Sequence, residues 1–278
     1  MKVNADLHNH LKTRSDRLGI NFNRAIDVAR ERLGAGGIIG VVNFDDFLYE
    51  QFSDLEGYER KNFGNGFYVP EKDILVVKGQ EVPAMQGHLL VLGLQGGKHL
   101  KSGDVEDVIE EATLGHGIII ADHPFYRDGI GKYLEGLAKE SCSHLNIFDG
   151  IEVYNNSAEL WIPFLTSFGA NRRAGEFFEA WKEKADIGAL ITSDGHSLAE
   201  LGKCCTQLEM PSYDEISDSR SLVRVLSESI RQSRGHGRIE NLIYPAVLHA
   251  GALALYKVKD KIFTRSFSYP DKPENITF

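Results

Sequence analysis

The chain has 278 residues, of which 42% are hydrophobic and 26% charged, a balance that excludes a disordered or collagen-like chain. Its net charge of −9 argues against a broad basic surface, so an extended nucleic acid is not the expected partner. Three cysteines cannot form a disulfide framework, and reduced thiols in a cytoplasmic compartment are the simplest interpretation.

The N-terminus leads directly into a polar, histidine-rich stretch and lacks the apolar segment of an export signal. The longest apolar tract, residues 242–256, is too short to cross a bilayer and carries His249 in its middle. We therefore expect a cytoplasmic protein without a membrane partner, and a buried C-terminal helix over this tract.

Short apolar runs alternate with amphipathic windows along the chain. The runs predict strands at residues 2–7, 37–42, 74–79, 89–94, 118–121, 150–153, 189–192 and 205–208. The windows predict helices at residues 23–33, 105–114, 130–139, 158–168, 172–184 and 221–232. This alternation indicates parallel strands covered by helices, in a barrel or a doubly wound sheet. No linker divides the chain, so we expect one domain over residues 1–278.

Histidines and carboxylates follow several of the expected strands. The first strand ends in Asp6-Leu7-His8-Asn9-His10, and residues two apart in an extended chain point the same way. His8 and His10 can therefore direct two imidazoles at one metal ion, although such a pair is a weak signal by itself. The same residue types recur at other strand termini, at Glu81, His88, His123, Asp194 and His196. Because parallel strands end at one face, the pattern predicts a metal centre there.

Four motifs in this order resemble those of the PHP family, the polymerase and histidinol phosphatase metallohydrolases. They are Asp6-Leu7-His8-Asn9-His10, Glu81 with Gly87-His88-Leu89-Leu90, His123-Pro124, and Ser193-Asp194-Gly195-His196-Ser197. The resemblance covers residues 1 to about 210. It implies an α/β fold, a distorted (β/α)7 TIM-like barrel with a C-terminal helical extension over about residues 211–278.

The resemblance also implies a set of metal ligands. The first ion would be held by His8, His10, Glu81 and Asp194. Glu81 would bridge to a second ion, which is also held by His88 and His123. A third ion would take His196 and Asp16. Imidazole and carboxylate ligands suit Zn, Mn or Fe, so the expected cofactors are two or three divalent transition-metal ions.

The second strand departs from the family pattern. Where members carry a Thr-Asp-His motif, this chain has Asn43-Phe44-Asp45-Asp46, so the usual third-site histidine is missing. Asp45 is the first candidate for a replacement oxygen ligand, and Asp46 the second. Two other interpretations stay open: the third site is weak or empty, or both acids cap the following helix.

Basic side chains near the expected ligands could hold a phosphate. They are Lys12, Arg14, Arg17 and Arg127, and solvated loop charge explains each of them equally well. Two metal ions roughly 3.5–4 Å apart can bind a phosphate between them and generate a hydroxide at neutral pH. Asn155 could bond the substrate or a metal-bound water, while Glu152 would only position the loop.

The expected function is that of a metal-dependent phosphoesterase acting on a small phosphorylated substrate, such as a nucleotide, histidinol phosphate or a sugar phosphate. Its catalytic groups would be Glu81, Asp194 and His196. One alternative is an amidohydrolase, which also uses paired histidines on the first barrel strand, but often bridges its ions with a carboxylated lysine. The other is a non-catalytic PHP-like domain, which the missing Thr-Asp-His motif would suit.

Overall fold

The computed structural model describes residues 1–11, 18–44, 47–54, 57–95, 98–159 and 169–240, all within one compact unit, Met1–Asn241. The strands are β1 (Lys2–Asp6), β2 (Gly37–Asn43), β3 (Lys61–Asn62), β4 (Gly66–Val69), β5 (Ile74–Ala84), β6 (Gly87–Leu92), β7 (Ile118–Ala121), β8 (Gly150–Asn155), β9 (Gly188–Thr192), β10 (Cys205–Glu209) and β11 (Gly237–Arg238). The α-helices are α1 (Leu18–Leu33), α2 (Leu48–Ser53), α3 (Val105–Leu114), α4 (Gly131–Glu140), α5 (Asn156–Glu159), α6 (Ala170–Trp181) and α7 (Ser219–Gln232). Two 3₁₀ turns are η2 (Cys142–Ile147) and η3 (Tyr213–Glu215).

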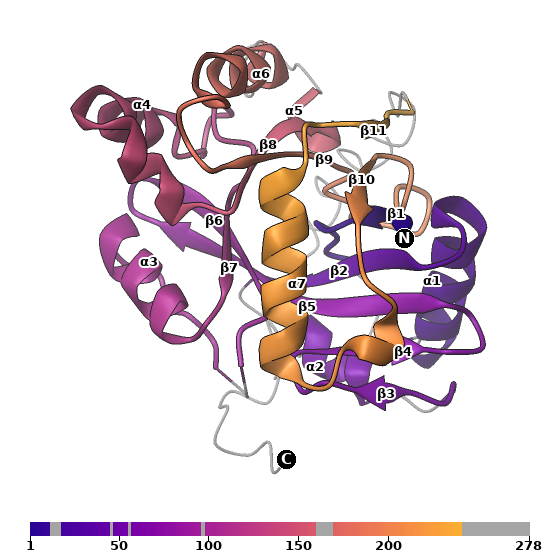
Figure 1. Ribbon diagram of the computed structural model, residues 1–278. Helices are drawn as coiled ribbons and strands as arrows, with labels where there is room; N and C mark the ends of the chain where they lie inside the picture. Colours follow the sequence, from indigo (N-terminus) through magenta and orange to yellow (C-terminus); the bar gives the residue numbers. More distant parts are fainter. Residues whose placement is uncertain (12–17, 45–46, 55–56, 96–97, 160–168, 241–278) are drawn as a thin grey trace, which may run out of the picture. The chain divides into compact units, whose positions relative to one another are not determined.

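The strands join in one sheet in the order β11-β10-β1-β2-β5-β6-β7-β8-β9, with β4 pairing on β5 and β3 on β4. The two ends of the sheet meet through a side chain. The Thr206 hydroxyl in β10 accepts a hydrogen bond from the Ile191 N–H in β9 (2.6 Å) and donates one to the Ile191 carbonyl (2.9 Å). Beyond the strands, the His10 N–H donates to the Gly195 carbonyl at 2.7 Å. The sheet is therefore a nearly closed barrel, which confirms the predicted distorted TIM-like fold (Figure 1).

The expectation of parallel strands is correct for only part of the barrel. β1, β2 and β5 run parallel to one another, as do β7, β8 and β9. β6 is antiparallel to both of its neighbours, and β10 is antiparallel to β1. Only Met85 and Gln86 separate β5 from β6, and a parallel crossover needs a dozen or more residues. β5 continues to Ala84 because this hairpin pairs residues that the sequence pattern assigned to a loop.

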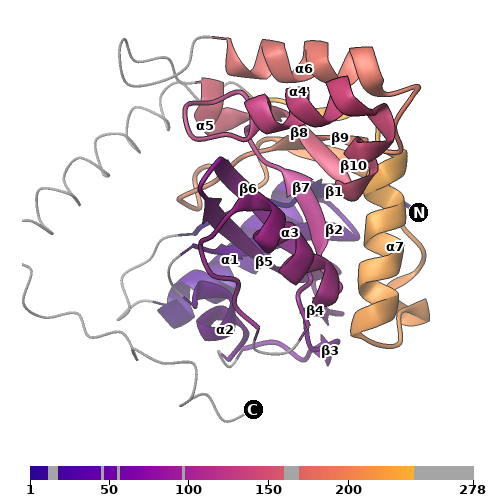
Figure 2. The same cartoon turned by 90° about the vertical axis from the view of Figure 1, so that its left-hand side faces the viewer.

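Helices cover the outer face of the sheet in two groups. α1 and α2 pack on β2 and β5, where Ile26 and Phe52 share a buried cluster with Ile39 and Val76. α3, α4 and α6 cover β6 to β9, and α4 and α6 lie side by side (Figure 2). Alternate residues of the strands point inward to a separate core. This arrangement leaves the strand ends free to present polar side chains.

α7 closes the end of the barrel at which the parallel strands begin. Leu222, Leu226 and Ile230 of this helix belong to the inner core. Gly188 opens β9, and a Cβ at this position would lie 1.7 Å from the Ile230 carbonyl oxygen. Because only glycine allows this approach, α7 can seal the start of β9. The functional side chains are left at the opposite end.

Capping residues in the sequence account for the observed starts of two helices. α3 and β7 have the predicted bounds, and Asp104 caps α3 by accepting from the Glu106 N–H. A capping box of Asp218 and Ser221 starts α7 two residues before the prediction. The helix expected at residues 158–168 is described only at its start, which lies in α5, and the helix expected at residues 242–256 lies outside the described residues. In the part of the chain that is described, no helix has the length and apolarity needed to span a membrane.

Candidate metal centre

The predicted metal ligands that the structure describes gather at one end of the barrel. His8 and His10 follow β1, His123 follows β7, and Asp194 and His196 follow β9. The β5–β6 hairpin brings two more, because His88 pairs with Pro83 and so faces the same side of the sheet as Glu81. Residues from five strands thus meet at the carboxyl ends of β1, β7 and β9.

Glu81 lies at the centre of this cluster. Its Oε2 is 2.9 Å from His10 Nε2 and 3.8 Å from His8 Nε2. Its Oε1 is 2.6 Å from His88 Nδ1 and 3.1 Å from His123 Nε2. Each carboxylate oxygen therefore serves a different pair of imidazoles, which is the arrangement of a carboxylate that bridges two cations.

The ligand atoms form two groups, each compact enough for a metal ion. One group is His8, His10 and Asp194, and the other is Glu81, His88, Asp122 and His123. Asp122 is a member that the sequence analysis did not select, although it directly precedes His123. The sequence did contain a signal for it, since Asp122 is an acidic residue at the end of the apolar run Ile118–Ala121.

Glu152 supports both groups from behind and is fully buried. Its Oε1 lies 2.9 Å from His8 Nδ1 and accepts from the Thr192 hydroxyl at 2.8 Å. Its Oε2 accepts from the His123 N–H at 2.9 Å and from Asn155 Nδ2 at 2.8 Å. The sequence analysis gave Glu152 only a loop-positioning role, but the structure joins it directly to a candidate ligand.

Two of the candidate ligands, His123 and Asp194, have a strained backbone conformation. His123 has φ +26° and Asp194 has φ +47°, which is the left-handed region that residues other than glycine rarely adopt. Successive residues in a strand point to opposite faces, yet Asp122 and His123 both belong to the second ligand group. The turn at His123 makes this convergence possible. Strain of this kind clusters at functional sites, where the surrounding structure sustains it.

Burial and neighbouring charges shift the pKa values of several groups in the cluster. Burial alone would lower the pKa of His8, but the Asp194 and Glu152 carboxylates outweigh it and hold that pKa well above its usual value. Burial would raise the pKa of Glu81, but hydrogen bonds from the surrounding imidazoles, His10 first, hold it well below. Burial raises the pKa of Asp122 to about 7.

Unsatisfied atoms show that the cluster suits cations. Asp194 Oδ1 and both carboxylate oxygens of Asp122 are buried without a hydrogen-bond partner, which is costly for a carboxylate. His8 Nε2 and His10 Nε2 face each other at 3.2 Å. An ion in the first group would contact His8, His10 and Asp194, and an ion in the second group would contact Asp122. The mixed imidazole and carboxylate donors suit Zn, Mn or Fe and do not select among them.

His196 lies beside the first group. Its ring centroid is 4.7 Å from that of His10, and its Nδ1 is 2.9 Å from the Asp194 backbone oxygen. Phe44, which directly follows β2, has its ring centroid 6.3 Å from that of His10. Asp16 and Asp45, the other expected third-ion ligands, lie outside the described residues.

The expected substrate-binding residues are placed only in part. Lys12, Arg14 and Arg17 lie outside the described residues, and Arg127 is exposed after His123. Asn155 is fully buried, with its amide nitrogen 2.8 Å from Glu152 Oε2 and 3.4 Å from Asp194 Oδ2. These contacts make Asn155 a residue that orients two carboxylates.

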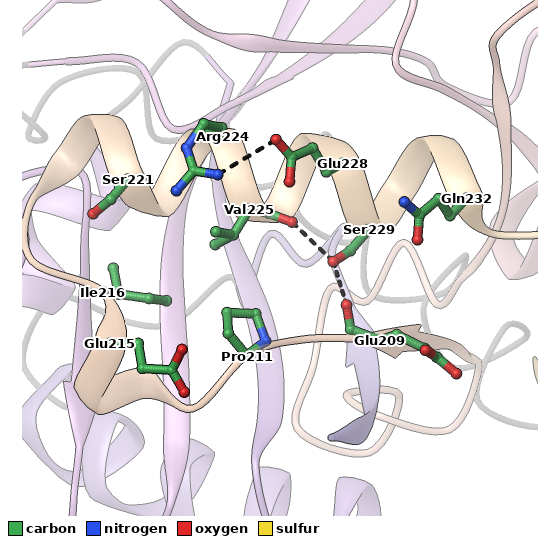
Figure 3. Close-up of a pocket in the computed structure, with 10 residues that line it drawn as sticks. All are labelled: Glu209, Pro211, Glu215, Ile216, Ser221, Arg224, Val225, Glu228, Ser229 and Gln232. Atoms are coloured by element: carbon green, nitrogen blue, oxygen red, sulfur yellow. Dashed lines mark hydrogen bonds and ion pairs between the residues drawn. The ribbon is translucent and has the colours of Figure 1, made fainter.

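A surface depression of about 340 Å³ lies away from this cluster, between α7 and the segment after β10 (Figure 3). Glu209, in its lining, pairs with Lys2 at the start of β1, whereas the metal ligands follow the end of that strand. Ser229, also in the lining of the depression, donates its hydroxyl hydrogen bond to the backbone carbonyl oxygens of Val225 and Glu209. The depression therefore belongs to the opposite end of the barrel and holds none of the candidate ligands.

Comparison with known proteins shows similarity in structure. No family model matches the chain, and no curated protein matches it in sequence. PsfC from Pseudomonas syringae PB-5123 has a TM-score of 0.56 at 16% identity, covering 92% of this chain and 99% of that one. The lesion-specific endonuclease PfuEndoQ from Pyrococcus furiosus has a TM-score of 0.51 at 17% identity, covering 86% of this chain.

A third solved structure, from Bacteroides vulgatus ATCC 8482, is a two-domain protein that contains a predicted PHP-like metal-dependent phosphoesterase. Its TM-score is 0.50 at 17% identity, covering 86% of this chain. The present chain spans 65% of that protein and 58% of the endonuclease. At these identities the likeness establishes a shared fold, and that fold is the one expected from the sequence motifs.

Proposed function

We propose that the chain is a member of the PHP family and a metal-dependent phosphoesterase that hydrolyses a small phosphorylated substrate. The observation that carries this proposal is Glu81, whose two carboxylate oxygens each face a separate pair of imidazoles. The shared fold with a predicted PHP-like phosphoesterase supports it.

In this proposal His8, His10, Glu81 and Asp194 would hold the first ion, and Glu81, His88, Asp122 and His123 would hold the second. Such a pair of ions would supply a Lewis-acid clamp for a phosphate and a nucleophile at neutral pH. His196 and Asp16 remain the proposed ligands of a third ion, with Asp45 as a further candidate.

The protein's own groups prepare the site. With a proton on His8 Nδ1 directed at Glu152, the Nε2 lone pair of His8 points at the first group, which is the tautomer a metal ligand requires. Asn155 holds Glu152 and Asp194 in place. Arg14, Arg17 and Arg127 are proposed to bind phosphate oxygens, and His196 is proposed to bind or exchange a proton beside Asp194.

The bridging group favours a phosphoesterase over an amidohydrolase. The central carboxylate is that of Glu81, whereas the lysine three residues earlier, Lys78, lies on the outer face of β5 and pairs with Glu50 at 2.5 Å. A non-catalytic domain without metal gains no support from the described ligand set, because its buried carboxylate oxygens would lack hydrogen-bond partners, which is unfavourable for folding.

The test combines metal analysis with a substrate screen. Protein purified without chelators should carry two or three transition-metal ions per chain, and should release phosphate from p-nitrophenyl phosphate, a nucleotide, histidinol phosphate or a sugar phosphate. Because one structural neighbour is a lesion-specific endonuclease, the screen should include a damaged DNA duplex. Absence of phosphate release, with metals confirmed, would reject the proposal.

A further inference from the structure

Asp6, the last residue of β1, is fully buried and belongs to neither ligand group. Each of its carboxylate oxygens accepts a hydrogen bond from a backbone N–H: Oδ1 from Ser193 at 3.0 Å and Oδ2 from Gly202 at 2.7 Å. Both donors lie in the loop between β9 and β10, one at its start and the other near its end. One buried side chain of β1 therefore holds both ends of the loop that carries Asp194.

The start of this loop lies against the segment that follows β1. The Gly195 N–H donates to the His8 carbonyl at 3.1 Å, and the Gly195 carbonyl accepts from the His10 N–H at 2.7 Å. Asp194, in the left-handed region at φ +47°, lies between Ser193 and Gly195, whose backbones are both held by hydrogen bonds to β1 or to the residues after it. The direction of the Asp194 side chain follows from the backbone that these contacts fix.

The loop also has anchors that do not involve Asp6. The Arg32 guanidinium in α1 donates to three carbonyl groups of the loop, those of Leu198, Ala199 and Leu201. The Ser193 hydroxyl accepts from the Cys204 N–H at 3.0 Å and donates to the Cys204 carbonyl at 3.2 Å. With these anchors the loop stays on the barrel when Asp6 is changed, and the loss of an Asp6 hydrogen bond acts locally, beside Asp194.

We propose that Asp6 is a positioning residue for the first ion, because its two hydrogen bonds fix the loop that directs Asp194 at the first ligand group. This inference rests on the metal centre of the proposed function. Asp194 Oδ1 lies 3.7 Å from both His8 Nε2 and His10 Nε2. Metal–ligand bonds keep their length to within about 0.2 Å, so a small displacement of this carboxylate weakens the binding of an ion that all three side chains hold.

The test is Asp6→Asn, with calorimetric titration of the metal-free protein by Mn²⁺. The amide presents its NH₂ group to one of the two backbone N–H groups, so one hydrogen bond is lost in either orientation. First-ion affinity should fall about 10- to 100-fold, while the second ion binds as in the native protein. Asp149→Asn is the matched control, because this buried carboxylate accepts from the Ile119 N–H at the opposite end of the barrel.

A double-mutant cycle identifies the ligand through which Asp6 acts. In an Asp194→Asn background the positioned carboxylate is already gone, so Asp6→Asn should lower Mn²⁺ affinity by no more than about twofold. A residue that only supports the fold would cause the same loss in both backgrounds. Equal losses in the two backgrounds, or native affinity in Asp6→Asn alone, would overturn the inference.

Gly202→Val reaches the same contact from the loop, and it decides the question if Asp6→Asn does not fold. Gly202 has φ +71°, which a β-branched residue rarely adopts, so valine moves this N–H away from Asp6 and should cause the same loss of first-ion affinity. Gly64→Val, at φ +90° between β3 and β4, is its control. When only Gly202→Val folds, native affinity in it would overturn the inference.

The readout is metal binding, so it separates this inference from the proposed activity. Mn²⁺ binding without phosphate release would reject the phosphoesterase, and the affinities would still decide the role of Asp6. A native protein that binds neither Mn²⁺ nor Zn²⁺ would overturn both proposals.

Discussion

Glu152 Oε1 lies 2.9 Å from His8 Nδ1, and both side chains are fully buried. The contact fixes which nitrogen of His8 faces the proposed metal ion. It also places a buried negative charge behind the ligand, where it increases the basicity of the imidazole. A residue that never reaches the metal thereby governs how strongly one of its ligands binds.

Replacing Glu152 by glutamine should therefore weaken metal binding by about 10- to 100-fold. The amide keeps the shape but offers only one acceptor oxygen, whereas the carboxylate accepts on both sides, from the His123 N–H and the Thr192 hydroxyl. Metal titration calorimetry measures the change. Glu106→Gln, on the exposed face of α3, is the control. Native affinity in Glu152→Gln would show that the contact has no influence on the ligand.

Glu81→Gln should lower the metal content to one ion per chain or fewer, because an amide cannot bridge two cations with two anionic oxygens. The rate of hydrolysis of the best substrate should fall by more than about 100-fold. That is the largest loss expected when a residue that only hydrogen-bonds to a metal ligand is replaced. Elemental analysis and steady-state kinetics give the two numbers. Two tightly bound ions in this variant would contradict the bridging assignment.

Metal binding should strengthen as the pH rises through neutrality. The pKa of His8 is held well above its usual value by Asp194 and Glu152, so this imidazole retains its proton in the metal-free protein. An ion must displace that proton, and the displacement becomes easier at higher pH. Calorimetric titrations in two buffers of different ionisation enthalpy would count the released protons. Affinity that does not change between about pH 6 and 8 would contradict this expectation.

The buried ion pair of Lys78 and Glu50 should be costly to break. Lys78→Met leaves the Glu50 carboxylate buried and unpaired, and should reduce the free energy of unfolding by about 3–5 kcal/mol. Replacing both residues with apolar ones should recover part of this loss. Lys72 pairs with Asp27 at 2.6 Å on the surface, where solvent screens the two charges, so Lys72→Met should have little effect on the free energy of unfolding. Urea denaturation of the four proteins tests the contrast.

Sequence reasoning selected most of the residues that converge at the candidate metal centre, because they adjoin apolar runs that predict strands. His8, His123 and Asp194 could be found in this way, since each directly follows a short buried strand. Glu152 could not be assigned its role, because its contacts join residues from β1, β7 and β9 that are far apart in the chain. The antiparallel course of β6 depends on a two-residue turn that contains neither glycine nor proline.

The pairing of β1 with β10 has a consequence for how the molecule is made. Lys2 lies opposite Glu209, so β1 finds one of its two neighbouring strands only after residue 209 has been synthesised. Until then β1, which His8 and His10 follow, has one unpaired edge. The first ligand group, His8, His10 and Asp194, joins residues that are far apart in the chain, so metal binding at this group is a measure of long-range folding.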